Sequence, residues 1–261
     1  MLLEGKRALV FGVANAKSIA YGIASEFRRH GARLAFNYVG EAIQKRVEPI
    51  SRELGGEFTF QCDVTDDGQI AQAADLARER WGGVDILVHS VAFANRDELM
   101  GRFVDTSRAG FAQALDISAY SLVALCRAFE PLLAPGASVL TMTYYGAQKV
   151  ITNYNVMGVA KAALEASVRY LALDLGRRQA RINAISAGPV RTLAASGISD
   201  FRKIFDHIEK HAPLGRNITT TEVGGAATFL ASDLASGITG ETIFVDSGYN
   251  ILGIATPREE A

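Results

Sequence analysis

Tyr154 and Lys161 are the two residues of this chain whose types and spacing most directly suggest chemistry. In a helix, the seven steps between them at about 100° each bring the second side chain to within roughly 20° of the first, about 10 Å along the axis. Both side chains would then face one pocket. A phenol that donates a hydrogen bond, beside an ammonium, forms an acid that stabilises an oxyanion. The same spacing also occurs in ordinary amphipathic helices, so the pair alone leaves both interpretations open.

The composition is that of an ordinary soluble chain of 261 residues, with 49% hydrophobic and 21% charged residues. The formal net charge of −1 argues against a general nucleic-acid or anionic-membrane surface. Two cysteines, Cys62 and Cys126, are too few for a disulfide framework and suit a reducing cytosol. No signal peptide is recognisable, and no apolar run approaches membrane-spanning length. These features predict a cytoplasmic protein that binds neither nucleic acid nor membrane.

Short apolar and β-branched runs alternate with longer helical patterns along the chain. Strands are expected at residues 7–11, 33–38, 58–62, 86–90, 138–143, 181–186 and 242–245, and helices at 18–30, 41–53, 67–81, 110–133, 154–175 and 221–231. This alternation predicts an α/β, Rossmann-type fold: a doubly wound parallel sheet of about seven strands with helices on both faces. No linker or repeat divides the pattern. One dinucleotide-binding and catalytic domain is therefore expected over residues 1–256, with a loose tail at 257–261.

The turn after the first expected strand has the residues of a phosphate-binding site. Gly12 lets the backbone turn sharply, Ser18 can cap the next helix or contact phosphate, and Gly22 lets that helix approach the sheet closely. Together they could seat a pyrophosphate on the amino end of a helix. Because the spacing differs from the usual Gly-x-Gly-x-x-Gly, a strand-to-helix turn without a ligand is the alternative.

Two further strand ends, at residues 62–64 and 89–94, are polar or small where ligands of open α/β sheets bind. Asp63 could accept a hydrogen bond from an adenine amine, although a role in capping the next helix explains it equally well. The second strand ends in Asn37-Tyr38-Val39-Gly40, without an acid to bind a ribose. No arginine directly follows this strand to receive a 2′-phosphate, which favours NADH over NADPH, although Lys45 and Arg46 one helical turn on could do so.

From Gly5 to about Gly248 the chain resembles the short-chain dehydrogenase/reductase superfamily, and within it the bacterial enoyl-acyl carrier protein reductases of type II fatty acid synthesis. The motifs that carry the resemblance are the segments 18–22, 62–64, 154–161 and 183–198, the last of which is specific to that branch. The resemblance implies reduction of the 2,3-double bond of trans-2-enoyl thioesters on acyl carrier protein by NADH. It also implies a homotetramer.

The resemblance also implies roles for individual residues. Tyr154 would be the acid that anchors the thioester carbonyl, Lys161 would bind the nicotinamide ribose, and Tyr144 would be the second active-site tyrosine. Thr192 and the backbone of Val190 would hold the nicotinamide carboxamide. Residues 202 and 203 match basic positions through which the resembling enzymes meet their carrier, but Ser199 replaces a further lysine there.

Two sets of residues complete the expected site. The cofactor would be bound by residues at strand ends and on the catalytic helix: Gly12, Ser18, Ile19, Asp63, Val64, Ser90, Val91, Ala92, Lys161, Val190 and Thr192. The acyl slot would be lined by Ala94, Leu99, Tyr144, Tyr154, Met157, Ala194, Ile198 and Phe201. A lid at about 190–211 would order over bound ligand and exclude water. The four histidines show no metal-binding spacing, so no metal is assigned.

Two residues separate this interpretation from its main rival, a short-chain oxidoreductase that acts on a ketone or alcohol. Such enzymes carry Tyr-x-x-x-Lys with a Ser thirteen residues before the Tyr, but this chain has Met157 and Tyr144 at those positions. In a conjugated thioester, hydride goes to the β-carbon and negative charge appears on the carbonyl oxygen, so acid and hydride donor must stand further apart. Tyr154, one turn earlier, suits that separation. The second rival is a catalytically silent nucleotide-binding protein, which would have no need to keep both Tyr154 and Lys161.

Overall fold

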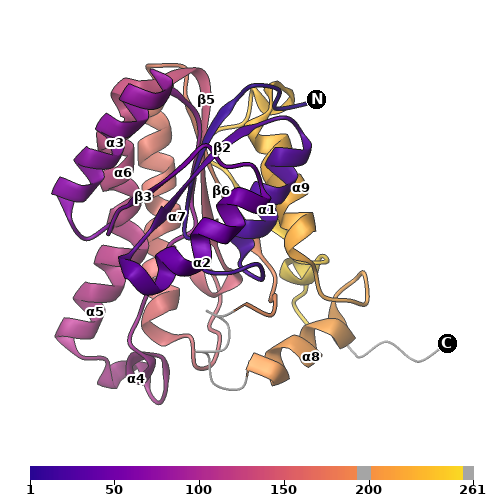
Figure 1. The fold of residues 1–261 in the computed structure, drawn as a ribbon. Coiled ribbons are helices and arrows are strands. Elements are labelled where there is room, and N and C mark those ends of the chain that lie inside the picture. Colours follow the sequence, from indigo (N-terminus) through magenta and orange to yellow (C-terminus); the bar gives the residue numbers. More distant parts are fainter. Residues whose placement is uncertain (193–200, 255–261) are drawn as a thin grey trace.

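In the computed structural model, which describes residues 1–192 and 201–254, one seven-stranded sheet forms the centre of the molecule (Figure 1). The strand order is β3-β2-β1-β4-β5-β6-β7, and every neighbouring pair is parallel. The strands are β1 (Arg7–Phe11), β2 (Arg33–Tyr38), β3 (Phe58–Gln61), β4 (Val84–His89), β5 (Leu133–Thr143), β6 (Arg181–Ala187) and β7 (Thr242–Val245). The predicted fold class is confirmed, and each predicted strand is present.

Helices cover both faces of the sheet (Figure 1). One face packs against α3 (Asp67–Trp81), α6 (Ser121–Phe129) and α7 (Asn155–Gly176), and the other against α1 (Ile19–Arg29), α2 (Gly40–Glu53) and α9 (Thr220–Ala231). Along β1, Leu9 and Phe11 lie in one core, whereas Ala8 and Val10 lie in the other. Because such strands are buried on both faces, they read as continuous apolar runs in the sequence.

The helix predicted as one element over residues 110–133 is wrong. The structure has α5 (Arg108–Leu115), a π-helical segment (Asp116–Tyr120), α6, and a 3₁₀ turn (Glu130–Leu132), after which β5 begins at Leu133. Ser118 exchanges hydrogen bonds with the backbone of Phe93, and Ser121 donates to the Ile117 carbonyl. The Ser121 bond competes with the regular helical hydrogen bonds inside this segment, and the Ser118 bonds tie the segment to the strand end after β4.

Two further short or surface helices were not predicted as separate elements. They are α4 (Arg96–Leu99) and α8 (Phe201–His211). α4 is a single turn, below the length at which a periodic pattern can be read. α8 falls within the expected lid, of which the structure describes residues 190–192 and 201–211. The expected tail at 257–261 lies outside the described residues.

The sequence-based statement that no apolar run approaches membrane-spanning length also needs correction. The helical stretch Arg108–Leu132 has 25 residues, and the mean hydropathy of its apolar 18-residue part is 1.3, enough to cross a membrane by length and composition alone. Half of its apolar window is buried inside the protein. In this fold the stretch contains α5 and α6, and α6 packs on the sheet, so its apolar residues are explained by the core.

Gly22 is required for contact between two helices, not between a helix and the sheet as predicted. A Cβ atom at Gly22 would lie 2.5 Å from the Thr220 carbonyl oxygen of α9. On the facing helix, a Cβ at Gly224 would lie 2.6 Å from the Gly22 carbonyl oxygen. The two glycines therefore let α1 and α9 pack at backbone distance, which fixes α1 on its face of the sheet.

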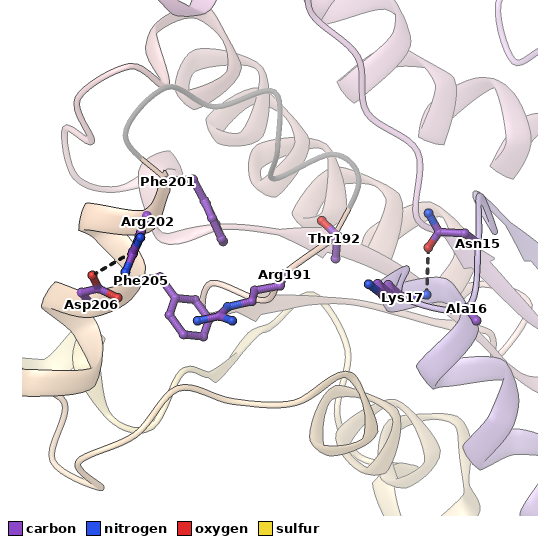
Figure 2. Close-up of a pocket in the computed structure, with 9 residues that line it drawn as sticks. All are labelled: Asn15, Ala16, Lys17, Arg191, Thr192, Phe201, Arg202, Phe205 and Asp206. Atoms are coloured by element: carbon purple, nitrogen blue, oxygen red, sulfur yellow. Dashed lines mark hydrogen bonds and ion pairs between the residues drawn. The ribbon is translucent and has the colours of Figure 1, made fainter.

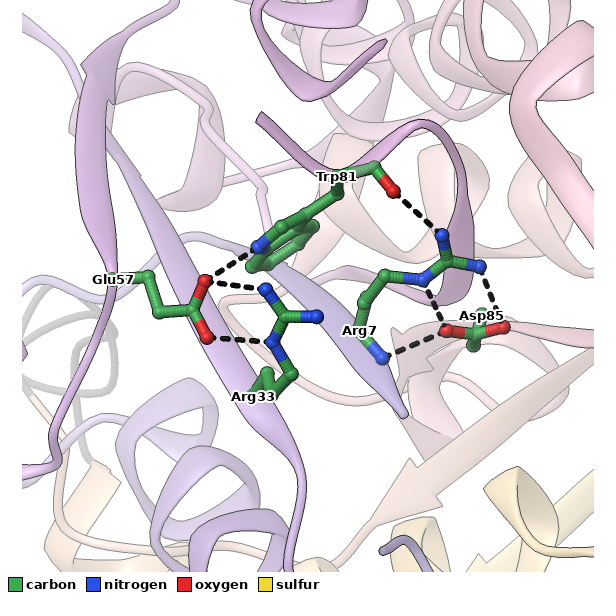
Figure 3. A network of polar contacts seen from close by, with 5 residues as sticks. All are labelled: Arg7, Arg33, Glu57, Trp81 and Asp85. Carbon is green, nitrogen blue, oxygen red and sulfur yellow. Dashed lines mark hydrogen bonds and ion pairs between the residues drawn. The ribbon is translucent and has the colours of Figure 1, made fainter. Parts of the chain in front are cut away.

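At the amino edge of the sheet, two ion pairs meet at Trp81 (Figure 3). Arg7, the first residue of β1, binds Asp85 of β4 through Nε at 2.7 Å and Nη2 at 3.1 Å, and donates to the Trp81 carbonyl at 2.8 Å. Arg33, the first residue of β2, binds Glu57, which also accepts from the Trp81 indole N–H at 2.7 Å. The network joins the starts of β1, β2 and β4 at the edge opposite the strand ends where ligands are expected.

Replacing Asp85 by Asn should lower the free energy of unfolding by about 1–3 kcal/mol, because Arg7 would lose its partly buried anionic partner. Burial alone would raise the pKa of Asp85, but hydrogen bonds from the Arg7 side chain and backbone outweigh it and hold the pKa below its ordinary value. The wild-type contribution should therefore persist above about pH 4 and fade as the pH falls further. Urea unfolding between pH 3 and 7 measures both effects.

Asp75→Asn is the matched control for this change. Asp75 pairs with Arg78 on the exposed surface of α3, where an ion pair contributes little. Equal unfolding free energies for the two variants would show that the Arg7 and Asp85 pair does not stabilise the sheet.

Candidate functional site

Tyr154 and Lys161 are buried on the same side of α7, as their spacing predicts. Tyr154 immediately precedes the helix and already has helical backbone angles, and its side chain is 7% exposed. Lys161, two turns along, is 5% exposed. Both contact the carboxyl end of β5: the Tyr154 ring packs on Tyr144, and the Lys161 ammonium donates to the Met142 carbonyl at 2.8 Å. The phenol and the ammonium therefore lie at one strand end.

Tyr144 and Tyr154 form an edge-to-face pair with ring centroids 5.1 Å apart and planes at 77°. Burial raises the pKa of Tyr144 to about 12 and holds the pKa of Tyr154 well above its ordinary value. Both phenols are therefore protonated at neutral pH and can donate a hydrogen bond. Within residues 1–192 and 201–254, no protein group is hydrogen-bonded to either hydroxyl.

Two glycines that the sequence analysis missed hold the Tyr154 ring in place. A Cβ atom at Gly146 would lie 2.5 Å from Cδ1 of Tyr154, and one at Gly158 would lie 2.8 Å from the Gly146 carbonyl oxygen. The turn after β5 can therefore touch both the ring and α7 only because these residues lack side chains. The signal was present in the sequence as glycines on either side of Tyr154, but only the fold shows that they meet.

Lys161 has an environment that makes its charge sensitive to pH. Burial lowers the pKa of Lys161 to about 8, while the negative charge of Glu165 works in the opposite direction. His89 of β4 is completely buried between Thr141 and Ser121, and burial followed by the charge of Lys161 lowers the pKa of His89 to about 3. His89 is therefore neutral, and Lys161 is mostly protonated near pH 7.

The ends of β1 and β4 meet where the strand order reverses, which is where open α/β sheets bind ligands. Gly12 has φ +99, and a Cβ there would lie 2.1 Å from the Ser90 carbonyl oxygen. The amide of Gly12 donates to the buried Asn37 side chain, which in turn donates to the Cys62 carbonyl. Asn37 thus ties three strand ends together, a role that the sequence analysis did not identify.

The predicted cofactor residues lie along this edge. Ser18 caps α1, as one of the two interpretations predicted: its Oγ accepts from the Tyr21 amide, and Ile19 begins the helix. Val91 and Ala92 follow β4 and are anchored one residue later by the hydrogen bonds between Phe93 and Ser118. These residues therefore line the switch point on both sides.

Asp63 does not cap the next helix. Its carboxylate accepts from the backbone and hydroxyl of Thr65, whereas Asp66 caps α3 through the amides of Gly68 and Gln69. The prediction that Asp63 caps the next helix is therefore wrong. Asp63 instead forms a local turn with Thr65. Asp63 and the buried Val64 follow one residue after the end of β3, at the same edge of the sheet.

A cavity of about 860 Å³ opens at this edge between the β1–α1 loop and α8 (Figure 2). Asn15, Ala16 and Lys17 form one wall, and Phe201, Arg202, Phe205 and Asp206 form the other, with Arg191 and Thr192 between them. The Arg191 guanidinium lies 4.5 Å from the centre of the Phe205 ring. Of the predicted site residues, Thr192 and Phe201 line this cavity, whereas Tyr144, Tyr154 and Lys161 do not.

Most of the residues predicted to line the acyl slot gather in a separate apolar cluster. Leu99, Tyr154 and Met157 are buried in it, and Ala94 and Tyr144 pack against it. Phe201 lies apart, at the cavity, and Ala194 and Ile198 lie outside the described residues. In the described part of the chain, no three His, Cys, Asp or Glu side chains converge as they would around a metal ion.

Comparisons with known proteins agree over nearly the whole chain. Residues 12–250 match the family described as enoyl-(acyl carrier protein) reductase. Enoyl-[acyl-carrier-protein] reductase [NADH] 1 of Rhizobium meliloti is 53% identical, over 97% of this chain and 93% of the relative. Two solved reductases each superpose with a TM-score of 0.95 at 51% identity. The Bacillus cereus reductase, in complex with NADP⁺ and indole naphthyridinone, matches over 97% of this chain and 99% of its own chain. The Anaplasma phagocytophilum reductase, in complex with NAD, matches over 98% of this chain and 98% of its own chain.

Replacing Gly146 by Ala should lower the free energy of unfolding by about 1–3 kcal/mol, because the new methyl group would overlap the Tyr154 ring. Gly225→Ala is the control, since a Cβ at Gly225 in α9 meets nothing within 4 Å. That change should be neutral or stabilise by up to about 1 kcal/mol. Denaturant unfolding of both variants measures the difference. Equal stability for Gly146→Ala and the wild type would show that the ring is not held by this contact.

Proposed function

Because the chain belongs to the enoyl-(acyl carrier protein) reductase family, we propose that it is a cytoplasmic enzyme that reduces the 2,3-double bond of trans-2-enoyl thioesters. NADH is the hydride donor, acyl carrier protein delivers the substrate, and the pathway is type II fatty acid synthesis. The observation that carries the proposal is the placement of Tyr154 and Lys161 at the end of β5, with Met157 where a ketone reductase has its tyrosine. The described chain acts as one catalytic domain with α8 in its lid.

The residues at the strand ends fit a dinucleotide. Gly12 brings the backbone of β1 against Ser90 at the switch point, and α1 begins directly after the Ser18 cap. The amide groups in the first turn of a helix have no helical partner and suit a pyrophosphate. Lys161 offers an ammonium for ribose hydroxyls, and Thr192 stands beside the cavity. Bound there, NADH supplies the hydride.

Tyr154 acts as the hydrogen-bond donor to the thioester carbonyl oxygen. When hydride adds to C3, the electron pair of the double bond moves toward C1, and negative charge appears on that oxygen. The Tyr154 hydroxyl stabilises this charge, and the nearby Lys161 ammonium strengthens the phenol as a donor. Protonation at C2 then completes the saturated thioester. Tyr144, edge-on to Tyr154, limits where the acyl chain and the carbonyl can lie.

A rival assignment as a ketone or alcohol oxidoreductase is disfavoured by the surroundings of residue 157. Met157 is buried among Leu99, Ala114 and Val156, so no hydroxyl is available one turn after Tyr154. A thioether there forms an apolar wall for an acyl chain. A catalytically silent nucleotide-binding protein would show no turnover in the assay that follows.

Tyr154→Phe should slow reduction of a crotonyl thioester by roughly 10²–10³, the loss expected for one transition-state hydrogen bond, and leave NADH binding nearly intact. Lys161→Ala should weaken NADH binding and turnover together. Tyr170→Phe, on the exposed surface of α7, is the control and should change neither. Stopped-flow oxidation of NADH and fluorescence titration measure rate and binding separately. Undiminished single-turnover rates in a Tyr144→Phe, Tyr154→Phe double variant would remove the tyrosines from the mechanism.

The same assay with NADPH tests the choice of cofactor. Val39 and Gly40 offer no charge after β2, and Lys45 is already paired with Glu41 at 2.7 Å in the first turns of α2. We therefore expect a modest preference for NADH. A kcat/KM for NADPH equal to or above that for NADH would contradict it.

Acyl carrier protein should dock beside α8, because its acidic surface complements Arg202 and Lys203. The Arg202 side chain is 93% exposed, and its distance of 3.8 Å to Asp206 leaves it available to a partner. Replacing both residues by Glu should raise KM for an acyl-carrier substrate, more at low salt, and affect an acyl-coenzyme A much less. Arg177→Glu with Arg178→Glu, exposed at the far end of α7, is the control. Equal effects on both substrates would exclude a carrier site here.

A homotetramer would cover the exposed apolar side chains of the outer helices. Tyr170 and Leu173 of α7 are 75% and 70% exposed, and Tyr120 lies at the surface before α6. Such side chains on adjoining helices are typical of a subunit interface. Light scattering should give four times the 28.0 kDa chain mass, and Leu173→Arg should lower it. A wild-type monomer at micromolar concentration would contradict the proposal.

A further inference from the structure

Glu165 is a buried carboxylate on the catalytic helix that neither the sequence analysis nor the mechanism above uses. It lies one turn after Lys161 in α7 and is only 7% exposed. Its Oε1 accepts a hydrogen bond from the Thr143 hydroxyl at 2.8 Å, and its Oε2 accepts one from the Gln148 amide at 3.2 Å. Since a buried charge without partners is strongly unfavourable, these two donors are what make the position tolerable.

The two donors flank the segment that carries Tyr144. Thr143 is the last residue of β5, and Gln148 follows the turn that contains Gly146. The Lys161 ammonium holds the neighbouring Met142 carbonyl. Thus Lys161 and Glu165, one helical turn apart, bind consecutive residues of β5 through opposite charges. These two attachments set the position of α7 along its axis and its rotation about that axis, relative to the end of β5.

We propose that Glu165 is a positioning residue for enoyl reduction, which clamps the Tyr144 segment to the helix that follows Tyr154 and carries Lys161. The inference rests on the proposed function for its chemistry, but the clamp itself is a feature of the structure. The Glu165 carboxylate is hydrogen-bonded to Thr143 and Gln148. It acts on the two tyrosine rings through these two residues.

Glu165 also acts electrostatically on Lys161. Other ionisable side chains near this pair are His89 from β4, Tyr144 after β5, Tyr154 before α7, and Arg169, whose guanidinium donates to the Glu165 carbonyl at 3.1 Å. The Arg169 guanidinium is positive, and the pKa values of the other three are shifted in the directions that keep each of them neutral near pH 7. Glu165 is therefore the anionic group that favours the ammonium form of Lys161 against the effect of burial. Without it, Lys161 would lose its proton at a lower pH, and ribose binding would weaken as the pH rises.

Glu165→Gln tests the charge while keeping the shape of the side chain. The pH above which NADH binding weakens should move down by at least about half a unit, so that the dissociation constant at pH 8 rises at least about twofold and changes less at pH 6.5. The control is Glu26→Gln, which neutralises another buried glutamate, in α1 and paired with Arg29. It should leave the pH profile unchanged. Fluorescence titration of NADH from pH 6 to 9.5 measures both.

Gln148→Leu tests the clamp at an exposed position and leaves Glu165 its hydrogen bond from Thr143. Losing this hydrogen bond should reduce kcat for crotonyl thioester by about threefold to tenfold, without moving the pH profile of NADH binding. If Glu165→Gln fails to fold, the kcat of Gln148→Leu alone tests whether the clamp is needed for the reaction.

A Glu165→Gln protein with a wild-type pH profile and wild-type kcat would overturn the inference, as would a Gln148→Leu protein with unchanged kcat. A wild-type protein that binds no NADH and reduces no enoyl thioester would instead overturn the proposed function. The two failures are therefore distinguishable.

Discussion

Burial of the Lys161 ammonium is the constraint on which the rest of the site depends. A charged amine can stay in the interior only where strong acceptors surround it, and here the Met142 carbonyl at the end of β5 provides one. That requirement holds α7 against a single strand end. The position of Tyr154 follows, because it is joined directly to the start of α7. Burial then acts in opposite directions on the pKa values of amine and phenol, and both groups remain protonated near pH 7.

The parallel sheet supplies the second condition, a common edge at which distant parts of the sequence meet. Gly12 touches Ser90, and Asn37 ties the ends of β1, β2 and β3 together. At the opposite edge, Arg7 and Asp85 hold the starts of β1 and β4 in register. One edge of the sheet is therefore fixed by ion pairs and hydrogen bonds, while the other presents small residues and polar backbone to a ligand. This separation lets stability and binding depend on different residues.

Much of the fold could be predicted from the sequence because its signals are local. Strands buried on both faces read as apolar runs, and α3 was predicted with its observed bounds, at which the structure shows Asp66 and Gly82 as caps. The helix predicted over 110–133 failed because serine side chains and Pro131 divide it in ways that periodicity does not show. Gly22 was assigned the wrong partner. A glycine in the sequence indicates that another element comes close, but it does not show which element that is.

The site was predicted in part for the same reason. The spacing of Tyr154 and Lys161 is a helical signal, and it placed both side chains on one buried face. Gly146 and Glu165 carry no such signal, because their partners are in contact only through the packing of α7 on β5. A glutamate four residues after a lysine reads as an exposed ion pair, whereas here the two side chains bind neighbouring residues of the strand.

The central claim is that Tyr154 donates a hydrogen bond to the carbonyl oxygen of the thioester, whereas hydride is added to a different carbon, C3. Isotope transfer tests it most directly: the protein is incubated with crotonyl thioester and NADH deuterated at C4 of the nicotinamide, and the product is analysed by NMR. The account predicts deuterium at C3 of a saturated thioester, with hydrogen from solvent at C2. Deuterium on the carbonyl carbon, in an aldehyde or alcohol product, would contradict it.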